Sequence, residues 1–144
     1  MHRRILVLFL VLTSLGAGAA WAGENEPAPV PELTAFHLVM AKCWHTDYPA
    51  KDWAAIRQAA PELVMLAGAL QKATLPAGLQ SRKATFDSKA LILVAEVGKL
   101  AQTAKGKDDA ALSKALIDVH EAYHQLATAL YKKEEPEHNE CTKE

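Results

Sequence analysis

Residues 109–132 read DAALSKALIDVHEAYHQLATALYK, and this stretch gives the clearest indication of the fold. Its apolar side chains recur every three or four residues, at Leu112, Leu116, Val119, Tyr123, Leu126 and Leu130. This spacing places them on one side of an α-helix, with polar residues on the other side. Asp108 precedes the stretch and is a candidate N-cap, because its carboxylate can accept a hydrogen bond from the first turn. The stretch is therefore predicted to be an amphipathic helix that buries one face.

Three further stretches show the same spacing. Helices are expected over about 32–46, 52–74 and 82–105. Asp52 and Ser81 are candidate N-caps of the second and third helices, and Pro61 predicts a kink or a break within the second. The chain shows no strand pattern and no internal repeat. Four amphipathic helices with short connections predict an all-α fold, an antiparallel up-down-up-down four-helix bundle.

The apolar stripes define the expected core of this bundle. In the second helix the expected inward positions are Ile56, Ala59, Leu63, Leu66 and Leu70. In the third helix they are Phe86, Ala90, Leu93, Val97, Leu100 and Ala104. Each set follows the period of an α-helix.

The first 22 residues have the composition of a secretory signal peptide. A basic start at 2–4 precedes an apolar run over 5–15, and small residues end at Ala22. We expect cleavage before Gly23 and export to the periplasm, with no membrane contact afterwards, because the apolar run is too short to be a good span. A proline-rich lead at 23–31, the bundle at 32–132 and a polar tail at 133–144 complete the expected organisation.

Charge and composition exclude one class of partner. Loss of the signal peptide removes Arg3 and Arg4, so the 16 basic residues become 14 against 17 acidic ones, and the net charge changes from −1 to −3. This balance offers no basic stripe for nucleic-acid binding. The 122 remaining residues suffice for one hydrophobic core.

Histidines are concentrated in two of the expected helices. His120 and His124 are four residues apart, so they lie on one face of the last helix. His37 and Met40 share a face of the first helix. In an up-down bundle the first and last helices are antiparallel neighbours, which brings all four side chains to a similar level. The sequence thus predicts a metal or haem centre between these helices.

Four features are spread over about residues 33–131: Leu33-x3-His37, Gln71-Lys72-Ala73-Thr74 before Pro76, Phe86, and Ala122-Tyr123-His124-Gln125. Together they resemble the cytochrome b-562 family of periplasmic four-helix haem proteins. The resemblance implies a non-covalent b-type haem, electron transfer to a periplasmic redox partner, and His124 as one axial ligand of the iron.

His37 stands where that family has its second axial ligand, a methionine. Two imidazole ligands would lower the reduction potential relative to a histidine–methionine pair. Met40 is the alternative ligand, and Phe86, Trp44 and Leu116 are expected to line the haem pocket with it. The chain has no Cys-x-x-Cys-His motif, so covalent haem attachment is excluded.

Two other functions remain open. The first is a copper- or zinc-binding protein for metal buffering or sensing, with His37, Met40, His120 and His124 as ligands. The second is a structural or partner-binding bundle without a cofactor. His120-Glu121-x-x-His124 also matches the zinc-protease motif, but an all-helical chain offers no substrate-binding strand, so we expect no enzymatic activity. The sequence does not indicate the oligomeric state.

Cys43 and Cys141 are the only cysteines. An oxidising compartment favours a disulfide between them, and a thiolate ligand is the alternative for Cys43. The extended tail is long enough to bring Cys141 to the first helix.

The segment after the first helix is rich in polar aromatic residues, with Trp44, His45, Tyr48 and Trp53 close to Asp52. We expect these side chains to close one end of the bundle. A second metal site built from His45 and Asp52 is the alternative.

Overall fold

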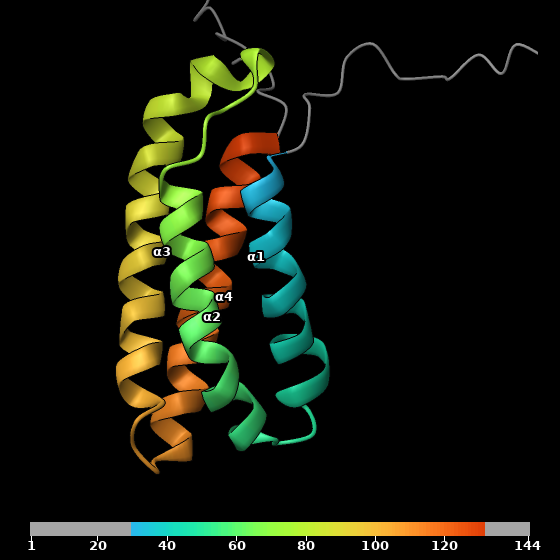
Figure 1. The fold of residues 1–144 in the computed structure, drawn as a ribbon, viewed down its shortest axis with the longest axis vertical. Coiled ribbons are helices and arrows are strands. Elements are labelled where there is room, and N and C mark those ends of the chain that lie inside the picture. The colour runs from blue at the N-terminus through green and yellow to red at the C-terminus, as the bar shows by residue number, and fades with distance from the viewer. Residues whose placement is uncertain (1–29, 132–144) are drawn as a thin grey trace, which may run out of the picture.

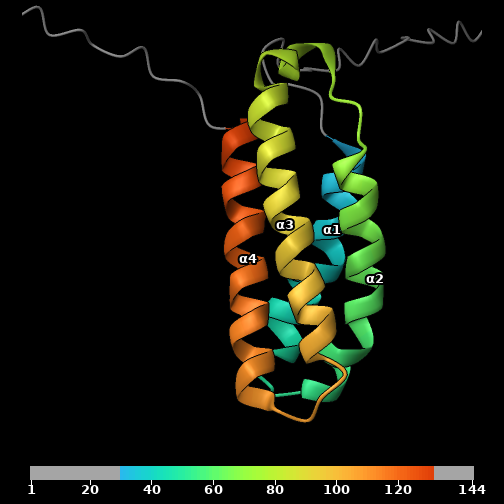
Figure 2. The same ribbon diagram turned by 90° about the vertical axis from the view of Figure 1, so that its left-hand side faces the viewer.

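The computed structural model describes residues 30–131, and this part of the chain is helical apart from short connections. Four α-helices pack around one hydrophobic core (Figures 1 and 2): α1 (Pro31–Lys42), α2 (Trp53–Gln71), α3 (Lys83–Thr103) and α4 (Asp109–Tyr131). Residues 30–131 contain no strand. The all-α fold class and the packing of four helices are thus confirmed. None of the helices in this range has the length and apolar character needed to cross a membrane.

The first and last helices lie side by side and contact each other through aromatic side chains. At one end the backbone N–H of Val30 donates a hydrogen bond to the hydroxyl of Tyr131 at 3.2 Å. At the other end Ser113 Oγ donates to the hydroxyl of Tyr48 at 3.3 Å. Figure 1 shows the start of α1 beside the end of α4. The expected proximity of the two histidine-containing helices is therefore present.

The core follows the apolar stripes closely. In α3 the residues at positions 86, 90, 93, 97 and 100 are all buried. In α2 the side chains of Ala60 and Ala67 are buried, whereas Ala59 and Leu66 are only partly covered. The buried face of α2 therefore lies slightly to one side of the expected stripe.

Two of the three expected N-caps form. The carboxylate of Asp52 accepts a hydrogen bond from Ala55 N–H at 3.0 Å. Asp108 does the same for Ala111 at 2.9 Å. Both contacts satisfy backbone donors that have no partner inside the helix.

The expected cap at Ser81 is wrong. A 3₁₀-helix, η2 (Ala77–Arg82), precedes α3, and this element places Arg82 rather than Ser81 at the N-cap. Arg82 contributes elsewhere, since its guanidinium donates to the carbonyls of Ala129 and Leu130 at 3.1 and 2.8 Å. A charged donor at these unpaired carbonyls stabilises the end of α4.

The first helix does not continue to Thr46 as a single α-helix. It ends at Lys42, and a π-helix, η1 (Cys43–Asp47), follows directly. The N–H of Tyr48 donates to the carbonyl of Cys43 at 2.9 Å, a hydrogen bond that spans five residues. The buried carboxylate of Asp47 binds Lys42 Nζ through both oxygens, at 2.7 and 2.8 Å. This ion pair ties the last residue of the π-helix to the end of α1.

Pro61 does not break α2, which runs continuously from Trp53 to Gln71. Proline removes one backbone donor and leaves the carbonyl four residues earlier without its helical partner. Pro61 is exposed, so water can satisfy that carbonyl. Of the predicted kink or break, the break is wrong.

Candidate functional site

A cavity of about 230 Å³ lies between α1, the π-helix and α4. Its lining contains most of the site residues expected from the sequence. The lining residues are His37, Met40, Ala41, Trp44, His45, His120, Tyr123 and His124. Two expected pocket residues lie elsewhere: Phe86 and Leu116 are fully buried in the core and do not border this cavity.

His120 and His124 face one another on α4. Their Nε2 atoms are 3.0 Å apart, because a spacing of four residues places the two side chains one turn apart on the same face. Two imidazoles bound to one ion through bonds of about 2.05 Å have nitrogens about 2.9 Å apart at a right angle and about 3.3 Å apart at a tetrahedral angle. The observed separation falls in this range, and it is also the distance of a hydrogen bond in which one neutral imidazole donates to the other.

Trp44 holds one member of this pair in place. Its ring stacks on the imidazole of His120 with centroids 3.8 Å apart and planes inclined by 10°. Tyr48 stacks on Trp44 with ring centroids 5.1 Å apart, and Trp53 contacts Tyr48 edge to face. The polar aromatic residues after α1 therefore pack against one another and extend to the histidine pair.

The surroundings of His120 favour its neutral form. Burial lowers the pKa of His120, and the imidazoles of His124, His45 and His37 lower it further. Glu121 acts in the opposite direction. A neutral imidazole has a free lone pair, which is the form that binds metal ions.

His37 has a different partner. Its exposed ring stacks on Tyr123 with centroids 5.2 Å apart and planes inclined by only 2°. Tyr123 in turn stacks on the buried ring of Phe36 at 5.8 Å. His37 thus borders the same cavity as His124, but its ring lies flat against a tyrosine.

The space between the helices does not fit a haem as the side chains lie. Met40, which lines the cavity, is only 1% exposed and belongs to the hydrophobic core. The cavity is also smaller than the roughly 300–1,000 Å³ that sites for drug-sized ligands occupy. A porphyrin would require α1 and α4 to move apart and the stacked pair of His37 and Tyr123 to separate.

Metal ligands are only partly assembled. Within residues 30–131 no three histidine, cysteine or acidic side chains already surround a common point. The pair formed by His120 and His124 supplies two donors, and Met40 borders the same cavity with a thioether. An ion bound here would retain open coordination positions, because zinc is usually bound by four ligands.

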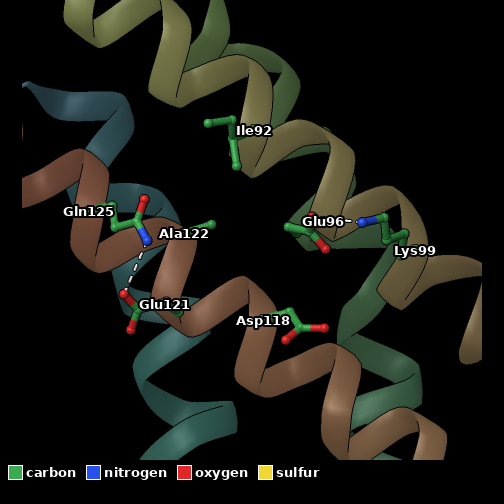
Figure 3. A pocket seen from close by; sticks show the side chains of 7 residues that line it. All are labelled: Ile92, Glu96, Lys99, Asp118, Glu121, Ala122 and Gln125. Carbon is green, nitrogen blue, oxygen red and sulfur yellow. Dashed lines mark hydrogen bonds and ion pairs between the residues drawn. The ribbon is translucent and has the colours of Figure 1, made fainter.

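Glu121 belongs to a different surface. It lines an open groove between α3 and α4 with Glu96 and Asp118, and its carboxylate accepts a hydrogen bond from Gln125 Nε2 at 3.1 Å (Figure 3). Two other carboxylates of this groove form ion pairs, Glu96 with Lys99 at 2.7 Å and Asp118 with Lys114 at 2.6 Å. The carboxylate that a zinc protease would use to activate water therefore does not border the histidine cavity.

Cys43, the first residue of the π-helix, is fully buried. Burial raises the pKa of its thiol to about 11, and the nearby carboxylate of Asp47 acts in the same direction. The expected partner, Cys141, lies outside the described residues, as does the predicted signal peptide.

His45 is the residue that sequence reasoning placed least well. The sequence predicts that His45 closes one end of the bundle or forms a metal site with Asp52. In the structure it borders the cavity with His120 and His124. The sequence carries no signal for this position, because spacing along the chain does not show that Trp44 stacks on His120.

Comparisons with known proteins provide no relative for this chain: no family model matches it, and neither the curated proteins nor the solved structures give a match.

Proposed function

We propose that this protein binds a transition-metal ion through His120 and His124, at the cavity between α1, the π-helix and α4. The observation that carries the proposal is the 3.0 Å separation of the two Nε2 atoms. The stacking of Trp44 on His120 supports it, because a fixed imidazole loses little conformational freedom on binding. The role that fits best is metal buffering or sensing.

The donor types restrict the choice of ion. Imidazole nitrogen suits copper and zinc, and copper(II) binds such sites more tightly than other divalent ions of the first transition row. The thioether of Met40 adds a soft donor beside the cavity, which favours copper(I). We therefore expect Cu²⁺ to bind more tightly than Zn²⁺.

The test is calorimetric titration of the untagged protein with Cu²⁺ and with Zn²⁺. We expect one tight site per chain, abolished by the double substitution His120→Ala with His124→Ala. The matched control replaces Glu121 and Gln125 by alanine, since these residues have the same spacing on α4 but line the other groove. Equal affinity in the double histidine variant and the parent would refute the proposal.

Haem binding is the second candidate, and it requires α1 and α4 to move apart and His37 to leave Tyr123. One observation favours it: His37 and His124, the expected axial ligands, border the same cavity. The resemblance to the cytochrome b-562 family supports the same ligands and a role in electron transfer with a periplasmic partner. Addition of haem to the purified protein should then give a Soret band that changes in His124→Ala. Absence of that band would leave the metal site as the function.

Two further proposals accompany the function. We infer that the four helices alternate in direction as an antiparallel up-down-up-down bundle. The contacts of Val30 with Tyr131, and of Arg82 with the end of α4, support this.

We also infer export to the periplasm, from the signal-like residues 1–22. N-terminal sequencing of the exported protein tests the inferred export, and Gly23 is the expected first residue.

A further inference from the structure

The metal site proposed above is incomplete, because His120 and His124 supply only two ligands. The inference drawn here concerns a third ligand and rests on that proposed function. A zinc or copper ion held by His120 and His124 has at least two further positions to fill. Among the described residues, no third histidine, cysteine or acidic side chain is already in place. A third protein ligand must therefore be a side chain that borders the cavity and is free to turn toward the pair.

His45 meets both conditions. It lines the cavity with His120 and His124, and its side chain is exposed. It forms no ring contact of the kind that holds Trp44 and His37 within residues 30–131.

The other cavity residues are held more firmly. Turning His37 inward would separate its ring from Tyr123, against which it lies nearly parallel. Met40 is part of the buried core. His45 can rotate without loss of either kind of contact.

The π-helix explains why His45 is available. A π-helix carries one extra residue per hydrogen-bonded turn, and such insertions occur frequently at functional sites. Here the widened turn follows α1 directly and contains both Trp44 and His45. The ion pair between Lys42 and Asp47 fixes this turn at its two ends. The element thus holds Trp44 against His120 and presents the next residue at the same cavity.

We propose that His45 is the third imidazole ligand of the ion, turning into the cavity to form a three-histidine site with His120 and His124. Three protein ligands leave one position open, as in zinc sites that retain a water molecule. The open position would accept water or a small anion. Met40 stays a neighbour of the site rather than a required ligand.

The experiment compares single variants of the full, untagged chain in Cu²⁺ titrations and in electron paramagnetic resonance spectra that count bound imidazole nitrogens. We expect His45→Ala to weaken binding at least about tenfold and to reduce the number of bound imidazoles from three to two. The matched control is Thr46→Ala, an exposed neighbour outside the cavity lining, which should change neither quantity.

Three outcomes would overturn the inference. Unchanged affinity and nitrogen count in His45→Ala would show that the pair binds the ion without this residue, and the proposed function would stand. The same loss in His37→Ala, with His45→Ala unaffected, would assign the third ligand elsewhere. Failure of the parent protein to bind Cu²⁺ at all would refute the proposed function itself.

Discussion

Trp44 shows how one aromatic residue can determine the geometry of a pair of imidazoles. Its ring lies flat on His120 at 3.8 Å, so the imidazole cannot rotate freely away from His124. Groups that orient a metal ligand are usually worth 10–100-fold in metal affinity. The contact of Trp44 with His120 therefore concerns binding as well as packing.

We expect Trp44→Ala to weaken Cu²⁺ binding at least about tenfold, because His120 would lose the surface that orients it. Trp44→Phe should retain most of the affinity, since phenylalanine keeps an aromatic face at that position. Titration of both variants, with circular dichroism to confirm folding, checks this. Identical affinities in Trp44→Ala and the parent would show that the stacking has no part in binding.

Cys43 illustrates the opposite case, a chemically reactive group that the fold makes inert. Its thiol pKa is raised to about 11, so at pH 8 only about one thiol in a thousand is ionised. The thiolate is the form that reacts with alkylating reagents. In a Cys141→Ser background we expect very slow alkylation of Cys43 in native protein and rapid alkylation in urea. Fast labelling of the folded variant, measured by mass spectrometry, would contradict the burial of this thiol.

At the scale of a single element, the π-helix depends on the ion pair between Asp47 and Lys42. The carboxylate of Asp47 is almost completely buried, with its side chain 6% exposed, whereas that of Lys42 is 63% exposed. Loss of the carboxylate removes two charge-assisted hydrogen bonds near the core. The exposed lysine can still be hydrated, so the net cost is moderate.

We expect Asp47→Ala to lower the free energy of unfolding by about 1–2 kcal/mol. Asp87→Ala is the matched control: it removes the carboxylate from another lysine pair, formed with Lys83 on one face of α3. Both partners of that pair are about half exposed, so its loss should cost at most about 0.5 kcal/mol. Urea denaturation of the two variants measures the difference. Equal destabilisation would mean that the π-helix does not need its ion pair.

The buried faces and N-caps of the helices are the features of the fold that can be predicted from the sequence. The stripe of α3 from Phe86 to Leu100 predicted its buried face, because apolar residues at helical spacing have one favourable placement against a core. Asp52 and Asp108 predicted their caps through local hydrogen bonding alone. These predictions need only interactions within a few residues along the chain.

Features that depend on distant contacts were missed. The residues Cys43–Asp47 have no composition that distinguishes a π-helix from an α-helix. The contacts of this turn, the ion pair of Asp47 with Lys42 and the stacking of Trp44 on His120, form only in the folded protein. The cavity was anticipated through the positions of His37, Met40 and His124, but the stacking of His37 on Tyr123 was not. The orientation of a ring requires the tertiary arrangement of two helices, which spacing along one helix does not give.

At the scale of the whole molecule, the candidate site joins the two ends of the chain's helical region. His120 and His124 belong to the last helix, whereas Trp44 and His45 follow the first. An ion whose ligands come from both regions binds the folded protein and not the unfolded chain, because only folding brings these ligands together. Binding must therefore stabilise the fold by mass action.

This linkage gives a prediction that does not depend on the identity of the biological ion. With free Cu²⁺ at 100 times its dissociation constant, the free energy of unfolding should rise by about 2.7 kcal/mol. The double variant His120→Ala with His124→Ala should show no such rise, whereas the variant lacking Glu121 and Gln125 should behave as the parent. Urea denaturation at 25 °C with and without the ion measures the effect. If the parent gains no stability at a concentration that saturates its binding isotherm, the ion must bind the unfolded chain equally well. In that case the ligands need not be brought together by the fold, and the meeting of α1, the π-helix and α4 would not form the site.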